Sequence, residues 1–124
     1  MKEVFVDART RDEVAVLVVD GKKSLHSLTD YVEKGWIKRK TKRDALESEC
    51  CAILLALTVV HEDIVLCSDR DDLVNHLNGI ESPKIERKLH NCIREIKERI
   101  RGRKVVFKWV PRKSNPASSL ATKD

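Results

Sequence analysis

The pattern of hydrophobic and polar positions predicts three consecutive strands at the start of the chain. Residues Val4 to Asp7 have the composition of a short strand, and Val14 to Val19 form an uninterrupted valine-rich run, typical of a strand covered on both faces. Asp20-Gly21 follows at once and is a strong signal for a two-residue hairpin. We therefore expect the stretch from Lys22 to about Leu28 to return antiparallel to the second strand.

A polar, basic segment then leads into an apolar helix. Residues Asp30 to Arg43 are largely polar or basic and predict a strand end followed by an exposed connection. A helix is expected from about Asp44, because Asp44 and Glu47 resemble a capping box. Nearly every residue from Cys50 to Val60 is apolar, so this helix should be buried on most of its circumference.

The second half of the chain predicts a strand, two helices and a last strand. Ile64 to Cys67 is the expected strand, and Asp71 to Leu77 the first helix. Ser82-Pro83 supplies an N-cap and a first-turn proline for a longer helix, and Val105 to Val110 is the last strand. One apolar stripe runs along the longer helix and consists of Ile85, Leu89, Cys92, Ile93, Ile96 and Ile100.

Length and composition indicate one soluble domain spanning residues 1–124. The chain has 124 residues, of which 41% are hydrophobic and 36% charged, a balance that favours a globular protein over a disordered one. The longest apolar stretch is too short to cross a membrane, and the first strand begins too early for a signal peptide. The four cysteines form no C-x-x-C pair, so we expect free thiols in a cytoplasmic protein. The oligomeric state is left open.

The charge balance favours a polyanionic partner. Lysine and arginine number 25 against 20 acidic residues, which gives a net charge of +5. Basic residues cluster between Lys38 and Arg43 and again between Arg94 and Lys108. Each cluster taken alone is at least as consistent with an ordinary solvated surface.

Three acidic residues stand at the edges of apolar elements. Asp7 is expected to close the first strand, Glu49 lies in the first turns of the buried helix, and Asp69 closes the fourth strand. A buried carboxylate is costly unless it is paired or binds a metal ion, and ligand sites form where strand ends meet helix termini. The three together therefore predict a site for Mg²⁺ or Mn²⁺, which prefer oxygen ligands.

Each acid also has a plainer interpretation. Asp7 could cap a turn, Glu49 could pair with a lysine, and Asp69 could cap the following helix. Singly, each plainer interpretation is the better one; the order of strands and helices favours the metal site. Both tryptophans could stack on a base or sugar. For Trp109 the stronger expectation is packing in or beside the last strand, whereas Trp36, within the basic segment, is about equally consistent with either role.

Four segments of the chain resemble the ribonuclease H type I family, in particular its short archaeal and reverse-transcriptase-like forms. The segments are Val4-Phe5-Val6-Asp7, Glu49 to Leu57, Ile64 to Asp69, and Val105 to Ala121, the last with Trp109-Val110-Pro111-Arg112 and Asn115-Pro116-Ala117. None is specific alone, but they occur in the family's order and cover nearly the whole chain.

The resemblance implies a fold and an activity. The fold would be α/β, a five-stranded mixed sheet with strands one to three antiparallel and strands four and five added in parallel, flanked by helices. The activity would be metal-dependent hydrolysis of the RNA strand of RNA/DNA hybrids, with Asp7, Glu49 and Asp69 holding two Mg²⁺ or Mn²⁺ ions. Ser118 occupies the position of the family's usual fourth acid. The expected nucleic-acid contacts are Arg9, Trp36, Lys38, Arg39, Lys40, Lys42, Arg43, Arg112, Lys113 and Asn115.

The chain also departs from the family pattern. Ser118 replaces an acid, Ala8 and Arg9 stand where glycine and serine are frequent, and Asp71 replaces a glutamine. These changes predict reduced activity and leave two alternatives open. One is a catalytically impaired module that binds nucleic acid or another protein; the other is a nuclease of the same fold that cuts DNA or DNA junctions.

Overall fold

The structure is a computed structural model that describes residues 1–9, 14–27 and 45–118. Its base is a five-stranded mixed sheet. The strands are β1 (Lys2–Arg9), β2 (Val14–Val19), β3 (Lys22–Ser27), β4 (Ile64–Ser68) and β5 (Val105–Trp109). They lie in the order β3-β2-β1-β4-β5. Strands β1 to β3 pair antiparallel, whereas β4 pairs parallel with both β1 and β5. The predicted fold class is thereby confirmed.

The hairpin between β2 and β3 forms where the sequence predicts it. Asp20 and Gly21 have φ angles of 52° and 75°, the left-handed conformations that a tight two-residue hairpin requires. Their turn pairs Val19 with Lys22 and fixes the register of the whole β2–β3 ladder. Because side chains alternate across a strand, this register also fixes which residues of β2 face each side of the sheet.

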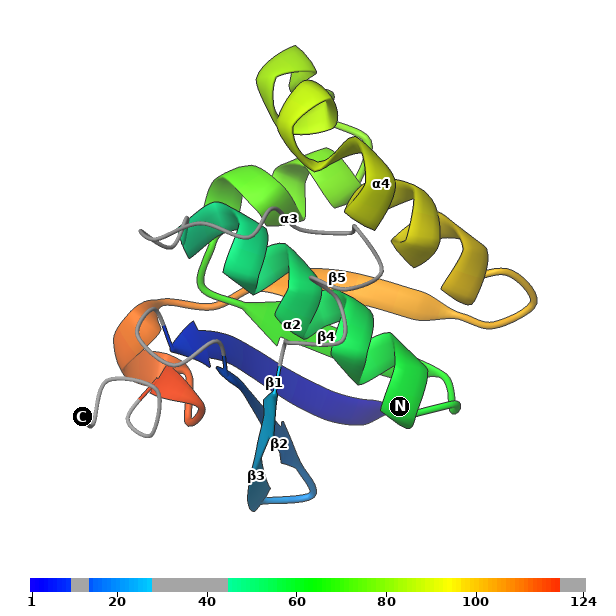
Figure 1. The fold of residues 1–124 in the computed structure, drawn as a ribbon. Coiled ribbons are helices and arrows are strands. Elements are labelled where there is room, and N and C mark those ends of the chain that lie inside the picture. Colours follow the sequence, from blue (N-terminus) through cyan, green and yellow to red (C-terminus); the bar gives the residue numbers. More distant parts are fainter. Residues whose placement is uncertain (10–13, 28–44, 119–124) are drawn as a thin grey trace.

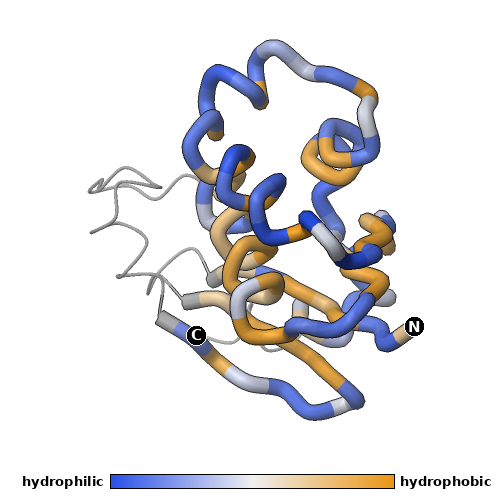
Figure 2. The backbone as a smooth tube through the Cα atoms, turned by 90° about the vertical axis from the view of Figure 1, so that its right-hand side faces the viewer, coloured by the Kyte–Doolittle hydropathy of each residue, from blue (hydrophilic) through white to orange (hydrophobic). Residues whose placement is uncertain are grey.

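Three described helices cover one face of the sheet (Figure 1): α2 (Ala45–Val59), α3 (Asp71–Leu77) and α4 (Pro83–Arg99). Helix α2 lies against β1 and β2 and is buried from Leu46 to Leu57, as its apolar sequence predicts. Helix α4 packs on α2 through its predicted stripe, and the Ser82 hydroxyl accepts a hydrogen bond from the Ile85 N–H at 3.4 Å. Figure 2 shows hydrophobic positions concentrated in the inner layer, whereas α4 is mostly hydrophilic.

The core has two parts, one on each face of the sheet. On the helix side, Ala15 and Leu17 of β2 join the large cluster around α2. On the opposite side, Val16 and Val18 pack with Ala117, which lies beyond the short 3-10 helix η1 (Arg112–Ser114). This arrangement explains why β2 is apolar at successive positions rather than alternately.

Some boundaries differ from those expected. Strand β1 runs on to Arg9, because Ala8 and Arg9 continue to pair with β2, so Asp7 lies inside the strand rather than at its end. The expected cap Asp44 and the basic segment from Lys38 to Arg43 lie outside the described residues. All four cysteines are buried thiols, and none of them forms a disulfide. No helix within the described ranges is long and apolar enough to span a membrane.

Replacing Ile93 by Ala should destabilise the fold substantially. Its side chain is 1% exposed in the core that α4 shares with α2, so truncation removes buried apolar area and leaves a cavity. We expect a loss of about 2–5 kcal/mol in the free energy of unfolding, measured by urea denaturation. The neighbouring Arg94 is exposed, and Arg94→Ala should change this free energy by less than about 0.5 kcal/mol. Equal effects would contradict the packing of α4 described above.

Candidate metal centre

The three predicted acids come together at one end of the sheet. One carboxylate oxygen each from Asp7, Glu49 and Asp69 lies within 4.8 Å of the other two. Asp7 is contributed by β1, Asp69 follows β4, and Glu49 lies near the start of α2. Figure 1 shows why they meet, since the head of β1, the end of β4 and the beginning of α2 lie at the same end of the molecule.

Neutral donors hold the three carboxylates in place. The Ala8 N–H donates to Asp7 Oδ1 at 2.9 Å. The Ser68 hydroxyl donates to Glu49 Oε1 at 2.8 Å, and the Ser118 hydroxyl donates to Asp69 Oδ2 at 3.1 Å. The orientation of the acids is therefore fixed by groups that carry no positive charge.

Burial and mutual repulsion make this cluster costly to ionise. Asp7 and Glu49 are 8% and 3% exposed. Burial raises the pKa of Asp7, and the neighbouring Asp69 carboxylate raises it further. Burial also raises the pKa of Glu49 well above its usual range, and the charge of Asp7 adds to this increase.

The residues of the cluster suit a divalent cation. Among the described residues, no lysine, arginine or histidine forms an ion pair with any of the three acids. Carboxylate oxygens are the preferred ligands of Mg²⁺ and Mn²⁺, and a bound cation would offset both the burial and the repulsion that raise the pKa values. The donor set and its charge thus fit the metal that the sequence predicts.

Two further predicted residues lie beside the acids. Ser118 is 5% exposed and contacts Asp69, although a hydroxyl cannot supply the negative charge of an acid. Asn115 is 3% exposed; its amide donates to the Val6 carbonyl at 3.0 Å and accepts from the Ala117 N–H at 3.0 Å. Asn115 therefore ties the segment that carries Ser118 to β1, and its predicted contact with nucleic acid stays a prediction.

Of the other residues predicted to contact nucleic acid, only some lie within the part of the chain that the structure describes. Arg112 and Lys113 are exposed on η1, which precedes Ser118 and belongs to the same segment. Their phosphate-binding role stays a prediction. The side chain of Arg9 and the residues Trp36, Lys38, Arg39, Lys40, Lys42 and Arg43 lie outside the description, and their contacts also stay predictions.

Sequence reasoning missed two features of the site. Ser68 was not among the predicted site residues, yet it is fully buried and orients Glu49. A polar residue directly before the third acid was the available signal. Trp109 was expected to pack, but its side chain is exposed and its indole N–H donates to the Asp69 carbonyl at 3.2 Å.

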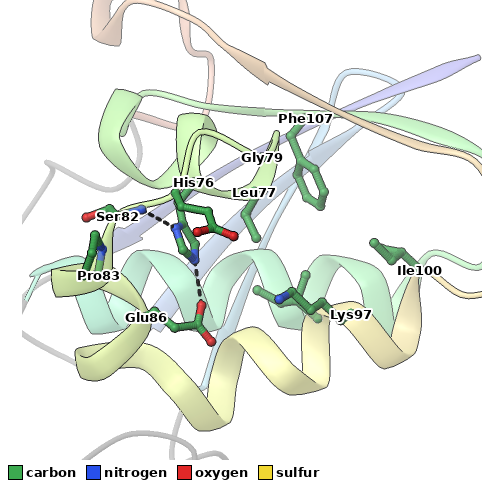
Figure 3. A pocket seen from close by; sticks show the side chains of 11 residues that line it. His76, Leu77, Gly79, Ser82, Pro83, Glu86, Lys97, Ile100 and Phe107 are labelled. Carbon is green, nitrogen blue, oxygen red and sulfur yellow. Dashed lines mark hydrogen bonds and ion pairs between the residues drawn. The ribbon is translucent and has the colours of Figure 1, made fainter.

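A separate cavity of about 540 Å³ lies between α3, α4 and β5 (Figure 3). Its walls are mainly apolar, and one of them carries His76. The His76 Nδ1 accepts from the Ser82 N–H at 3.0 Å, while Nε2 lies 2.8 Å from Glu86 Oε2. None of the three clustered acids lines this cavity, so it is distinct from the candidate metal centre.

Comparison with known proteins places the chain in a family. Residues 30–124 match the family model described as reverse transcriptase-like, and the chain belongs to this ribonuclease H-like family. Its fold is similar to that of RNase H1 from the halophilic archaeon Halobacterium salinarum NRC-1, with a TM-score of 0.68 and 17% sequence identity. The alignment covers 97% of this chain and 92% of that chain. No curated protein sequence matches the chain.

Removing one charge from the cluster should stabilise the metal-free protein. A carboxyl whose pKa is raised by folding disfavours the folded state once pH rises above its unfolded pKa, and this cost grows until pH has passed the folded pKa. Asp7→Asn keeps an oxygen for the Ala8 N–H and removes the charge. We expect the Tm in EDTA at pH 7 to rise by a few degrees, measured by circular dichroism.

The exposed Asp63 provides a matched control. Its Oδ1 accepts the Lys104 N–H at 2.9 Å, so Asp63→Asn makes the same chemical change at a site without clustered acids. This variant should leave the Tm nearly unchanged. A fall in Tm for Asp7→Asn would show that repulsion in the cluster is not the dominant effect.

Proposed function

We propose that this protein is a metal-dependent endonuclease that hydrolyses the RNA strand of RNA/DNA hybrids, with Mg²⁺ or Mn²⁺ as cofactor and two ions bound. One observation carries the proposal: Asp7, Glu49 and Asp69 present oxygens within 4.8 Å of one another on a ribonuclease H-like sheet. The name of the structurally similar archaeal protein, RNase H1, supports the choice of substrate.

The chain's own residues would hold the cations and position the nucleic acid. Asp7, Glu49 and Asp69 would be the metal ligands, each oriented by the neutral donors described above. Bound divalent cations would lower the pKa of a coordinated water and offset negative charge on the phosphodiester. The exposed Arg112 and Lys113 would contact phosphates, which makes the affinity for nucleic acid depend on salt.

Ser118 favours a second candidate function. Because its hydroxyl contacts Asp69 without supplying charge, the cluster has three negative charges to hold both cations. If this charge is insufficient, the chain would bind nucleic acid without efficient turnover. Binding of a hybrid without cleavage in either metal would support this second candidate.

Cleavage of a hybrid with a labelled RNA strand should require both the metal and Asp7. Asp7→Asn should lower kcat by at least about 100-fold, because it removes a charged metal ligand, whereas Asp63→Asn should leave kcat unchanged. The assay follows RNA fragments by gel electrophoresis in Mg²⁺, in Mn²⁺ and in EDTA. DNA duplexes and branched DNA run beside the hybrid would reveal a DNA-cutting or junction-cutting enzyme. Cleavage that persists in EDTA or in Asp7→Asn would refute the proposed mechanism.

Restoring an acid at position 118 should strengthen metal binding. In Ser118→Asp a fourth carboxylate would stand beside Asp69, and we expect the Mn²⁺ affinity to rise by roughly tenfold or more. The added repulsion should at the same time lower the Tm in EDTA. Ser118→Asn, of equal size but neutral, is the control, and both variants are titrated with Mn²⁺ by calorimetry. Equal affinities for the two variants would exclude a metal-ligating position there.

A further inference from the structure

Trp109 ends β5 directly beside the third acid of the cluster. Its backbone pairs with Ser68, the residue before Asp69, in the parallel β4–β5 ladder. Its indole N–H donates to the Asp69 main-chain carbonyl at 3.2 Å. The ring is thus held next to Asp69 by both its main chain and its side chain.

The indole is nonetheless left about half in water. Trp109 is 48% exposed and is the only aromatic among the large hydrophobic residues exposed in the described part of the chain. Phe107, two positions earlier and therefore on the same face of β5, is buried in the core. Packing in the core accounts for an aromatic side chain at Phe107. It does not account for the larger ring of Trp109, which remains exposed at the end of the strand.

An exposed aromatic ring that is already fixed is well suited to binding. A side chain held in one orientation loses little conformational entropy when a ligand stacks on it. Aromatic faces bind nucleotides of any sequence, because every base has a π-face. The segment after β5 continues with the exposed cations Arg112 and Lys113, so phosphates could be held nearby.

We propose that the exposed indole face of Trp109 is a nucleic-acid contact, against which one nucleotide of the bound strand stacks beside Asp69. The inference rests on the proposed function, since it takes nucleic acid as the ligand of the neighbouring centre. The contact is independent of sequence and supplies position rather than specificity, because it fixes the strand relative to the acids.

A purely structural role for Trp109 makes different predictions. If the indole served only to hold the Asp69 carbonyl, its N–H would be the important group, and phenylalanine could not replace it. If the ring face is the important group, phenylalanine should preserve most of the binding and leucine should not. Trp109→Phe and Trp109→Leu therefore separate the two roles.

The test measures the binding of a fluorescein-labelled RNA/DNA hybrid by anisotropy, in EDTA at low salt, so that metal ions do not contribute. We expect Trp109→Leu to weaken binding by roughly 5- to 100-fold, the range for losing one stacked nucleotide, and Trp109→Phe to stay within about threefold of the wild type. Val106→Ala on the same strand, where Val106 is 40% exposed, is the control and should have no effect. Thermal melts show whether each variant is folded.

A second arm separates the two ways in which a nucleotide could stack. A blunt-ended hybrid offers mainly sugars to the ring, whereas a hybrid with a single-stranded RNA overhang also offers unpaired bases. A larger loss for the overhang substrate indicates stacking on a base, and equal losses indicate packing against ribose; either loss supports the contact.

Three results would overturn the inference. They are equal weakening by Trp109→Phe and Trp109→Leu, unchanged binding in Trp109→Leu, and failure of the wild type to bind the hybrid in EDTA. The cleavage assay on the wild type and Asp7→Asn judges the proposed function separately. If the wild type cleaves the hybrid and Trp109→Leu binds it as tightly as the wild type does, only the proposed role of Trp109 is refuted.

Discussion

The burial of Asp7 and Glu49, together with their repulsion of each other and of Asp69, is the constraint on which the rest of the site depends. Like charges within 4.8 Å of one another repel strongly where water is scarce, and two of these carboxylates are almost fully buried. The fold keeps them there because β1 and β4 pair in parallel and α2 packs against β1. The stability of that packing sustains an arrangement that the acids alone would not adopt.

The way in which the acids are held preserves their ability to bind a cation. Serine hydroxyls and a backbone N–H orient the oxygens without neutralising them. Arg70, directly after Asp69 in the sequence, forms a bidentate ion pair with Asp72, with N···O distances of 2.9 and 3.2 Å. An arginine engaged in the same way with the cluster would offset its charge and compete with a metal ion. The negative potential is therefore retained at the acids.

Local patterns predicted the elements of this fold, and tertiary contacts determined what the patterns could not. The Asp20-Gly21 hairpin and the Ser82-Pro83 helix start depend on neighbouring residues, and both were predicted. The meeting of the three acids was expected only because strand ends and helix starts converge in such sheets. The bond from Ser68 to Glu49 and that from Trp109 to Asp69 join residues 19 and 40 positions apart, so no local pattern could reveal them.

The charge of the cluster also bears on how two cations could be held together. Three ionised carboxylates supply three negative charges, whereas two divalent cations carry four positive ones. In the proposed function, one phosphodiester of a bound strand would supply the missing negative charge, so a second cation would be held best when nucleic acid is present. With serine at position 118, the charge of the bound nucleic acid would replace the charge that a fourth acid would supply. Occupancy by both cations would therefore depend on nucleic acid more strongly than it would with an acid at that position.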